Sequence, residues 1–390
     1  MEAIQDRKSG YDAVFVGGGV IGLASAWRAA ARGAHVCVLE RNRPAAGASA
    51  VAAGMLAPVG ETSWGEQELL ALNFESLRRW PEFAGELEEQ TGHEVEFAVR
   101  GALHVALDRD EAEELRRNYE LHRELGLESE WLAASACRKL EPGLTTAVRG
   151  GAHVPGEAMV DPRKVGQALI GALEESDVSV ESGAEVVGGT RRAGSWHLET
   201  RDGREFEAAN VVVTAGCWSG SVDWLPAGAR PPVRPVKGEI ITLRGAANEP
   251  PCERIIGGER IYLVPRADGR LIVGATVEEL GFDTRLTAGG VHELLRESYR
   301  LLPEIAELEL VETRVGLRPG TPDNAPFIGH GPIGGLLIAT GHFRNGILLT
   351  PVTCDSIAAL LAGEAPPLDL EPFSPQRFAE HPADSAVEVA

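Results

Sequence analysis

The stretch Tyr11–Glu40, which reads YDAVFVGGGVIGLASAWRAAARGAHVCVLE, carries the pattern that decides the fold. Its two apolar runs, Tyr11–Val16 and His35–Glu40, have the length and composition of buried strands. The alanine-rich segment Ile21–Arg32 between them is helical in character, and Gly33 is suited to end that helix. A strand, a helix and a strand in so short a stretch imply two parallel neighbours joined by a right-handed crossover.

The turn after the first strand has three glycines in the pattern G-x-G-x-x-G. Gly17 allows the tight turn, Gly19 lets the backbone approach a pyrophosphate, and Gly22 lets the helix pack closely on the strand. Glu40 ends the second strand, where a carboxylate can accept hydrogen bonds from the ribose hydroxyls and would repel a 2′-phosphate. The pattern predicts a dinucleotide site for FAD or NAD, and a glycine-rich turn beside a surface glutamate is the plainer alternative.

Three further segments can bring backbone close to a bound cofactor. The run of small residues Ala48–Met55 could approach a phosphate or a flavin ring, although the start of a packed helix would look the same. Asn210–Gly216 is a buried-type strand that ends in a glycine. Gly341–Gly346 leads into a predicted helix, Asn345–Leu361, whose positive end would stabilise negative charge on a reduced flavin. Arg344 would add a full positive charge to that helix end or reach the substrate, unless it is an ordinary surface arginine.

Helical and strand patterns interleave along the rest of the chain. We expect amphipathic helices at 65–90 and 109–126, antiparallel strands at Val95–Val99 and Ala102–Leu107, a one-sided antiparallel sheet from Val236–Leu243, Ile261–Pro265 and Leu271–Thr276, and a last buried strand at Gly335–Thr340. The predicted fold is mixed α/β (α+β), with a Rossmann-like dinucleotide-binding domain and an inserted antiparallel-sheet substrate domain. The predicted pieces are 11–85, 150–220 and 310–364 for the first domain, and 86–149 and 221–309 for the second.

Composition excludes several classes of protein. The 390 residues carry a net charge of −21 and show no Lys/Arg run, which argues against a nucleic-acid partner. The five cysteines and ten histidines are scattered without metal-ligand spacing, so we expect no metal and a reducing compartment. The N-terminal MEAIQDRKSG lacks a signal-peptide core, and no apolar run has the length of a membrane span. We therefore expect a cytoplasmic protein without a membrane partner, with irregular ends before Tyr11 and after Pro372.

Eight motifs follow one another along residues 11–362. They are Gly17–Gly22, Glu40-Arg41, Ala48–Met55, Val211–Ser219 (VVVTAGCWS), Val236–Glu239 (VKGE), Tyr262–Arg266 (YLVPR), Gly316–Thr321 (GLRPGT) and Gly341–Leu348 (GHFRNGIL). In this order they resemble the D-amino-acid oxidase superfamily of FAD-dependent oxidoreductases. The last two motifs resemble those of the glycine oxidases, flavoenzymes that serve thiamine biosynthesis.

The resemblance implies a set of site residues. Arg318, Arg344 and Tyr262 would contact a small amino-acid substrate. From the residues themselves, Arg318 in its rigid turn suits a carboxylate, although it could instead pair with Asp323, and Tyr262 could be a core tyrosine. Residues that would line the FAD are Val20, Ile21, Glu40, Arg41, Ala48, Ser49, Ala53, Gly54, Met55, Val186, His342, Phe343, Arg344, Asn345, Gly346, Ile347 and Leu348, together with the fingerprint glycines.

The activity implied by the resemblance is oxidative deamination of glycine, sarcosine and small D-amino acids. The substrate carboxylate would bind Arg318, and hydride would pass from Cα to the flavin without a side-chain base. O2 would be reduced to H2O2, and the imine would give glyoxylate or pass to a thiazole-forming partner. The resemblance also implies a homo-oligomer such as a tetramer.

Two features of the sequence bear on the chemistry and its alternatives. No cysteine lies in Val315–Asp323 and no histidine in Ala45–Gly54, the places where related amine oxidases tether flavin, so FAD should be non-covalent. One alternative is a dehydrogenase for D-amino or N-methyl amino acids that uses an acceptor other than O2. Another is a flavin- or NAD-binding structural module of an RNA-modifying assembly, which the charge of −21 disfavours.

Overall fold

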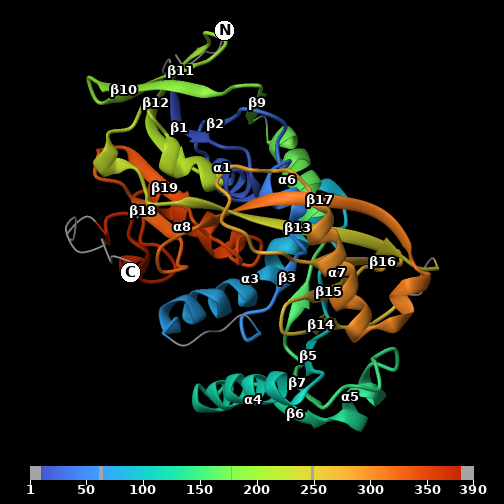
Figure 1. The fold of residues 1–390 in the computed structure, drawn as a ribbon. Coiled ribbons are helices and arrows are strands. Elements are labelled where there is room, and N and C mark those ends of the chain that lie inside the picture. Colours follow the sequence, from blue (N-terminus) through green and yellow to red (C-terminus); the bar gives the residue numbers. More distant parts are fainter. Residues whose placement is uncertain (1–9, 61–64, 177, 247–249, 379–390) are drawn as a thin grey trace, which may run out of the picture.

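The computed structural model describes residues 10–60, 65–176, 178–246 and 250–378. Within these ranges, two sheets of eight strands each form the frame of the molecule, and a third sheet has three short strands. Figure 1 shows the first sheet in the upper part of the molecule and most of the second sheet below it, with the long strands β13 (Arg234–Arg244) and β17 (Glu309–Gly320) running between the two regions.

The first sheet contains the predicted strand-helix-strand unit. The strand β1 (Tyr11–Val16) pairs in parallel with β2 (Val36–Glu40), and α1 (Val20–Ala31) connects them, so this prediction is confirmed. On its other side β1 pairs in parallel with β12 (Glu205–Val213), which pairs with β19 (Leu336–Thr340) at one end and β11 (Ser195–Thr200) at the other. The remaining strands of this sheet are β9 (Ser179–Ser182), β10 (Val186–Arg192) and β18 (Phe327–His330).

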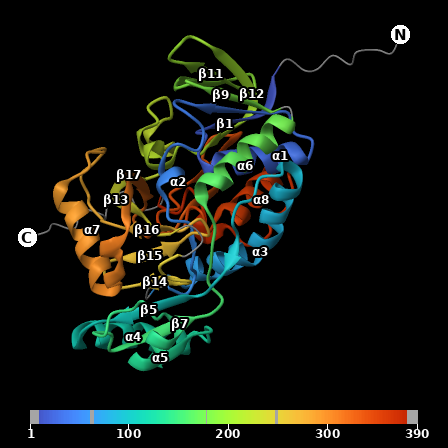
Figure 2. The same ribbon diagram turned by 90° about the vertical axis from the view of Figure 1, so that its right-hand side faces the viewer.

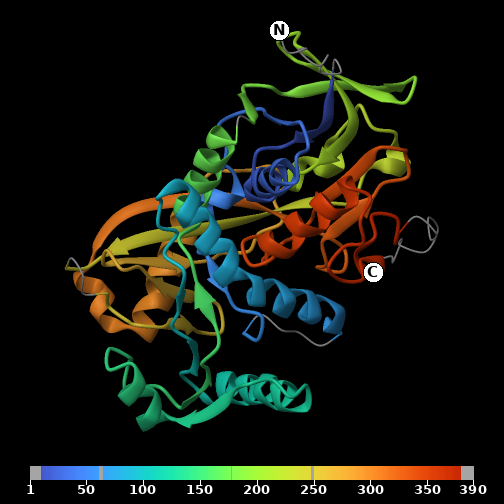
Figure 3. The ribbon, with the colours of Figure 1, turned by 180° about the vertical axis from the view of Figure 1, so that it is seen from behind.

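Helices bury one face of the first sheet. Ala13 and Phe15 of β1 point into a core shared with the helices, while Val14 and Val16 point into a second core on the opposite face. Figures 2 and 3 show the helices gathered on that one side. They are α1, α3 (Gln67–Thr91), α6 (Pro162–Glu175) and α8 (Thr350–Leu361), while the short α2 (Ala48–Val51) lies between the two sheets.

The second sheet has the strand order β17-β13-β16-β15-β14-β5-β7-β6 and is antiparallel except where β14 meets β5. The three predicted antiparallel strands correspond to β13, β15 and β16 and are confirmed. Its other strands are β5 (Ala102–Ala106), β6 (Glu130–Ala133), β7 (Gly150–Val154), β14 (Ile255–Gly257), β15 (Tyr262–Pro265) and β16 (Arg270–Gly274). The helices near it are α4 (Arg109–Glu124), α5 (Ala134–Leu140) and α7 (Ala288–Leu301).

Two local predictions were wrong in detail. The segments near Val99 and Ala102 form β4 (Ala98–Val99) and β5, but these strands lie in different sheets, because Gly101 between them has a positive φ that turns the chain. The strand β4 instead pairs with β8 (Ala158–Met159), which also pairs with β3 (Met55–Leu56). The last helix begins at Thr350 and not at Asn345, because the preceding residues form successive turns.

The expectation of irregular ends falls largely on positions 1–9 and 379–390, outside the described residues. The described part after Pro372 is packed: Phe373 is buried, and Arg377 binds Asp323 through two nitrogens. The predicted division into domains stays a prediction. The strands β7 and β17 both belong to the second sheet, where they pair with other strands. The prediction assigned β7 and residues 310–320 of β17 to the dinucleotide-binding domain.

Candidate active site

One cavity of about 1510 Å³ connects the glycine turn of the first sheet with the face of the second sheet. Its wall includes Gly17 and Glu40 at one end and Tyr262 and Arg318 at the other. Cavities for drug-sized ligands usually measure about 300–1,000 Å³. The larger volume here fits a dinucleotide with a small second ligand beside it.

Close packing fixes the glycine turn against the end of β12. Gly17 has φ +116°, and a Cβ on it would lie 2.5 Å from the carbonyl oxygen of Thr214. A Cβ on Gly22 would collide with the carbonyl oxygen of Gly17. The hydroxyl of Thr214 donates to that same oxygen at 2.7 Å. Gly17 and Gly22 are therefore required by packing, as the sequence predicted.

Two side chains from other segments hold the start of α1. The carboxylate of Glu40 accepts from the backbone N–H of Gly18 and of Asn42, both at 2.8 Å. The Ser49 hydroxyl accepts from the N–H of Val20 at 3.0 Å. Other amides in the first turn of a helix lack an intrahelical partner and attract phosphate. The residues present therefore fit the pyrophosphate and ribose of a dinucleotide.

Three arginines hold the small-residue run against the cavity. The carbonyl oxygen of Ala50 accepts from Arg163 at 3.3 Å and from Arg314 at 3.1 Å. The carbonyl oxygen of Ala53 accepts from Arg266, whose burial lowers its pKa to about 10. Because these carbonyls are tied down on the protein side, the small side chains of the run remain available to line the cavity.

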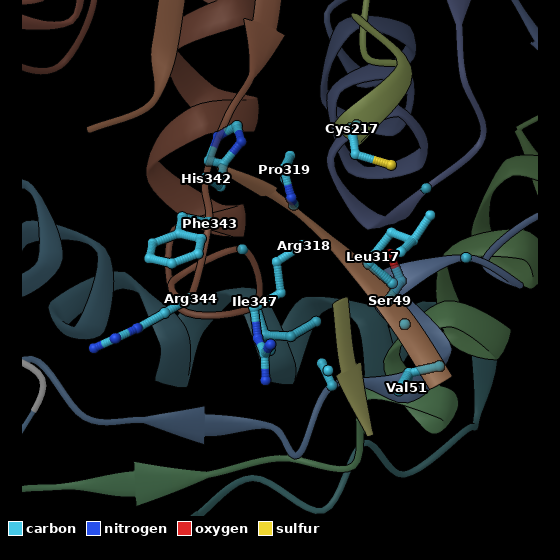
Figure 4. A pocket seen from close by; sticks show the side chains of 18 of the residues that line it. Ser49, Val51, Cys217, Leu317, Arg318, Pro319, His342, Phe343, Arg344 and Ile347 are labelled. Atoms are coloured by element: carbon cyan, nitrogen blue, oxygen red, sulfur yellow. The ribbon is translucent and has the colours of Figure 1, made fainter. Parts of the chain in front are cut away.

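The segment 341–349 forms a series of turns at the cavity wall. The backbone N–H of Asn345 donates to the carbonyl oxygen of His342 at 2.8 Å, and Phe343 has a positive φ of 45°. His342 is buried with Nε2 3.0 Å from the Thr353 hydroxyl, and burial lowers its pKa to about 3, so its imidazole is neutral at physiological pH. In Figure 4 the Arg344 side chain points away from Arg318, and Arg344 is exposed.

Arg318 points from β17 into the cavity (Figure 4) and is half-buried. Its Nη1 donates to the carbonyl oxygens of Lys237 at 3.4 Å and Thr276 at 3.2 Å. No carboxylate among the described residues forms an ion pair with it, and Asp323 binds Arg377 instead. The alternative pairing of Arg318 with Asp323 is therefore wrong.

The structure brings nearly all the predicted site residues to this one cavity. Gly22 and Leu348 are the exceptions: Gly22 packs α1 against the turn, and Leu348 is buried in the helical core, where its carbonyl oxygen accepts from Ser76 and Trp80. The predicted residues in the cavity wall are Gly17, Gly19, Val20, Ile21, Glu40, Arg41, Ala48, Ser49, Ala53, Gly54, Met55, Val186, Tyr262, Arg318, His342, Phe343, Arg344, Asn345, Gly346 and Ile347. Their contacts with ligands stay predictions.

Two residues of the motif VVVTAGCWS have roles that sequence reasoning missed. Thr214 holds the glycine turn, and the guanidinium of Arg41 lies 3.7 Å from the ring centre of Trp218 in the cavity wall. The motif was recognised, but nothing in its spacing indicates which side chains would face the turn. Cys217 also lines the cavity, and burial raises the pKa of its thiol to about 12.

Across residues 10–60, 65–176, 178–246 and 250–378, no three His, Cys, Asp or Glu side chains gather as metal ligands. In the same ranges no helix combines the length and the apolar character needed to cross a membrane.

The fold and the cavity define a dinucleotide-binding protein with room for a small substrate beside the cofactor. The profile of the DAO family, described as FAD dependent oxidoreductase, matches residues 12–360, and the chain belongs to this family. It is therefore an FAD-dependent oxidoreductase, and FAD is its cofactor.

Similar proteins are glycine oxidases and proteins that contain a related part. The chain is 35% identical to a glycine oxidase of Geobacillus kaustophilus, over 93% of this chain and 96% of the relative. It is 36% identical to the bifunctional protein ThiO/ThiG of Synechocystis, over 94% of this chain but only 54% of that longer protein. The crystal structure of the Geobacillus kaustophilus glycine oxidase superimposes with a TM-score of 0.90 at 34% identity, covering 95% of this chain and 99% of the other.

Proposed function

We propose that this enzyme oxidises glycine and other small amines, including sarcosine and small D-amino acids, to the corresponding imines. The observation that carries the proposal is one cavity lined by the dinucleotide turn and by Arg318. The guanidinium of Arg318 has no carboxylate partner among the described residues, and its planar fork suits a substrate carboxylate. The similarity to glycine oxidases supports glycine as the substrate.

The protein's contribution is binding and orientation. FAD, held by the glycine turn and Glu40, would supply the two-electron acceptor for the Cα hydride of the substrate, and O2 would be the final acceptor, reduced to H2O2. Arg318 would hold the carboxylate, and Tyr262, in the same wall, would contact the other end of the small substrate. A substrate whose own amino group is deprotonated needs no side-chain base. The neutral His342 would add no charge, so the positive charge of the site would come from the arginines. The imine would be hydrolysed to glyoxylate or transferred to a thiazole-forming partner for thiamine biosynthesis.

Further features of the proposal come from the sequence. FAD would be held without a covalent bond, the enzyme would act in the cytoplasm, and it would form a homo-oligomer. The Ala45–Gly54 segment offers no histidine, and the Val315–Asp323 segment offers no cysteine. Acid should therefore release all the flavin into solution, and flavin that stays with the precipitate would contradict a non-covalent site.

The proposed activity can be tested with the purified holoenzyme. Glycine, sarcosine and D-alanine should each bleach the visible FAD spectrum without air and form H2O2 in air, while L-alanine should do neither. Absence of FAD reduction by glycine would overturn glycine as the substrate.

The same assay separates an oxidase from a dehydrogenase. If glycine bleaches the flavin but the reduced enzyme forms peroxide slowly and reduces a quinone dye quickly, the acceptor is not O2. That result would favour the dehydrogenase alternative.

A further inference from the structure

Tyr262 and Arg318 share an unusual arrangement on the cavity face of the second sheet. In the register of the sheet, Tyr262 lies opposite Gly274, and Arg318 lies opposite Val236 with Gly238 two residues further along. A Cβ on Gly274 would overlap the phenol of Tyr262, and a Cβ on Gly238 would overlap the guanidinium of Arg318. Each polar head therefore lies flat on the sheet, over a glycine of a neighbouring strand.

Glycine in the interior of a strand is unfavourable unless something approaches the backbone closely. Gly238 pairs with Gly316 on the next strand, and both line the cavity along with Ala275, the residue that follows Gly274. This glycine-rich area lies at the centre of three adjacent strands, β16, β13 and β17. It is a gap in the side-chain layer, and the guanidinium of Arg318 occupies the part of it above Gly238.

The backbone around Gly238 also fixes the direction of the guanidinium. Its two carbonyl acceptors belong to Lys237 and Thr276, on neighbouring segments. A backbone bridge joins these segments, because Lys237 donates to Glu278 at 2.8 Å and Glu278 donates to Lys237 at 3.0 Å. On the opposite face, the fully buried ammonium of Lys237 lies 2.8 Å from the carboxylate of Glu239 and 3.4 Å from that of Glu278. The acceptors are therefore held rigidly from behind.

We propose that Gly238 is a positioning residue for carboxylate recognition, acting through Arg318, and that Gly274 does the same for Tyr262. Any side chain at position 238 would lift the guanidinium off the sheet and break its bonds to the two carbonyls. The remaining N–H groups of Arg318 would then no longer point where the substrate carboxylate lies. This inference rests on the proposed function, because it assumes that Arg318 binds a carboxylate.

The test uses the FAD-loaded enzyme and two measurements. Glycolate, which has a carboxylate but no amine, is titrated into the oxidised enzyme, and the visible FAD spectrum reports its Kd. Steady-state oxidation of glycine reports KM and kcat. Gly238→Ala should raise both the glycolate Kd and the glycine KM by about 10- to 100-fold, the loss expected for hydrogen bonds to a charged group, with a smaller effect on kcat. Gly85→Ala, in an exposed turn of α3 with open space around it, is the matched control and should change neither.

A double-mutant cycle separates positioning from a general structural effect. In an Arg318→Ala background, Gly238→Ala should change the glycolate Kd little, because the residue through which it acts is gone. Full additivity of the two losses, or a Gly238→Ala enzyme with wild-type glycolate affinity, would overturn the inference. If Gly238→Ala fails to retain FAD, Gly274→Ala combined with Tyr262→Ala, which removes the whole ring that a Cβ at position 274 would meet, provides the same cycle for the second pair.

The two proposals fail in different ways. Wild-type enzyme that binds glycolate through Arg318 but is not reduced by glycine would overturn the proposed function, and the role of Gly238 would still be read from the glycolate titrations. Wild-type enzyme that oxidises glycine while Gly238→Ala matches it in both measurements would overturn only the inference.

Discussion

At the scale of single residues, Arg318 is the group whose removal should matter most for the substrate. Arg318→Ala should lower kcat/KM for glycine on the order of 10²–10³-fold, because a desolvated carboxylate would lose its charged partner. Arg318→Lys should recover part of the loss, since an ammonium cannot reproduce the planar fork. Peroxide formation under steady-state conditions measures both variants.

The control for this prediction is the cofactor. The visible FAD spectrum should be nearly unchanged in both variants, and amines without a carboxylate should lose little activity. Near wild-type oxidation of glycine by Arg318→Ala would mean that the carboxylate binds elsewhere. Arg344 would then be the next residue to test, although its side chain points away from Arg318 (Figure 4).

Glu40 should matter for the cofactor and not for the substrate. Its carboxylate holds the N–H of Gly18 in the glycine turn and lines the cavity. Glu40→Ala should weaken FAD retention by about 1–3 kcal/mol, the cost of losing charged hydrogen bonds. Glu40→Gln keeps an acceptor and should lose less. Flavin content after extended dialysis measures this, and unchanged retention in Glu40→Ala would exclude Glu40 from the site.

At the scale of elements, the contact between α1 and the glycine turn should tolerate no added atom. Gly22→Ala would place a methyl group against the carbonyl oxygen of Gly17 and the hydroxyl of Thr214. We expect destabilisation of about 1–3 kcal/mol from overpacking, together with loss of FAD. Thermal unfolding and flavin content check the prediction. Gly85→Ala, with open space around it, should keep both, and a Gly22→Ala enzyme with full flavin content would contradict the packing argument.

The elements that could be predicted from the sequence are those whose partners are close in the chain. The unit of β1, α1 and β2 follows from apolar period and glycine spacing, and β13, β15 and β16 follow from alternation. The different sheets of β4 and β5 could not be predicted, because strand pairing depends on residues far along the chain. The start of α8 was misplaced since turns with helix-like composition precede Thr350.

The site follows the same rule. The glycines of the turn and Glu40 are recognisable because their spacing is set within one short unit. The roles of Thr214, Trp218 and Gly238 depend on which strand lies beside which, so they became visible only in three dimensions. Gly238 did carry a signal, because a glycine in the middle of an apolar strand indicates close approach of another group.

At the scale of the whole molecule, Asp161 links the helical layer to the second sheet. It caps α6 by accepting from the N–H of Arg163 at 2.9 Å, and it pairs with Arg270 of β16 at 2.9 Å. Burial tends to raise the pKa of its carboxyl group, but the positive charges of Arg266 and Arg270 outweigh burial and hold the pKa below its usual value.

A depressed pKa in the folded state gives a definite pH dependence. The stabilisation is fully present above the unfolded pKa of about 3.9 and is lost as the pH falls through the lower folded value. Asp161→Asn should therefore destabilise the protein by about 1–3 kcal/mol at pH 7, since the buried Arg266 loses a nearby negative charge and Arg270 keeps only Asp268 as its carboxylate partner. The difference in Tm between this variant and the wild type should shrink below about pH 4. A difference in Tm that stays constant from pH 7 to pH 3 would contradict this assignment.

The first sheet takes its strands from three distant stretches, 11–40, 179–213 and 327–340. This order affects how the protein can fold while it is synthesised on the ribosome. Translation at about 5–20 residues per second leaves roughly 15–60 s between the emergence of β2 and that of β19. During the first part of that interval one edge of β1 is unpaired, because β12 has not yet been made. Once β12 has been made, its own edge stays unpaired until β19 follows. A newly made chain therefore cannot bind flavin early. A chain that ends before position 340 would keep an unpaired strand edge, which can pair with other chains, and would not be a smaller working enzyme.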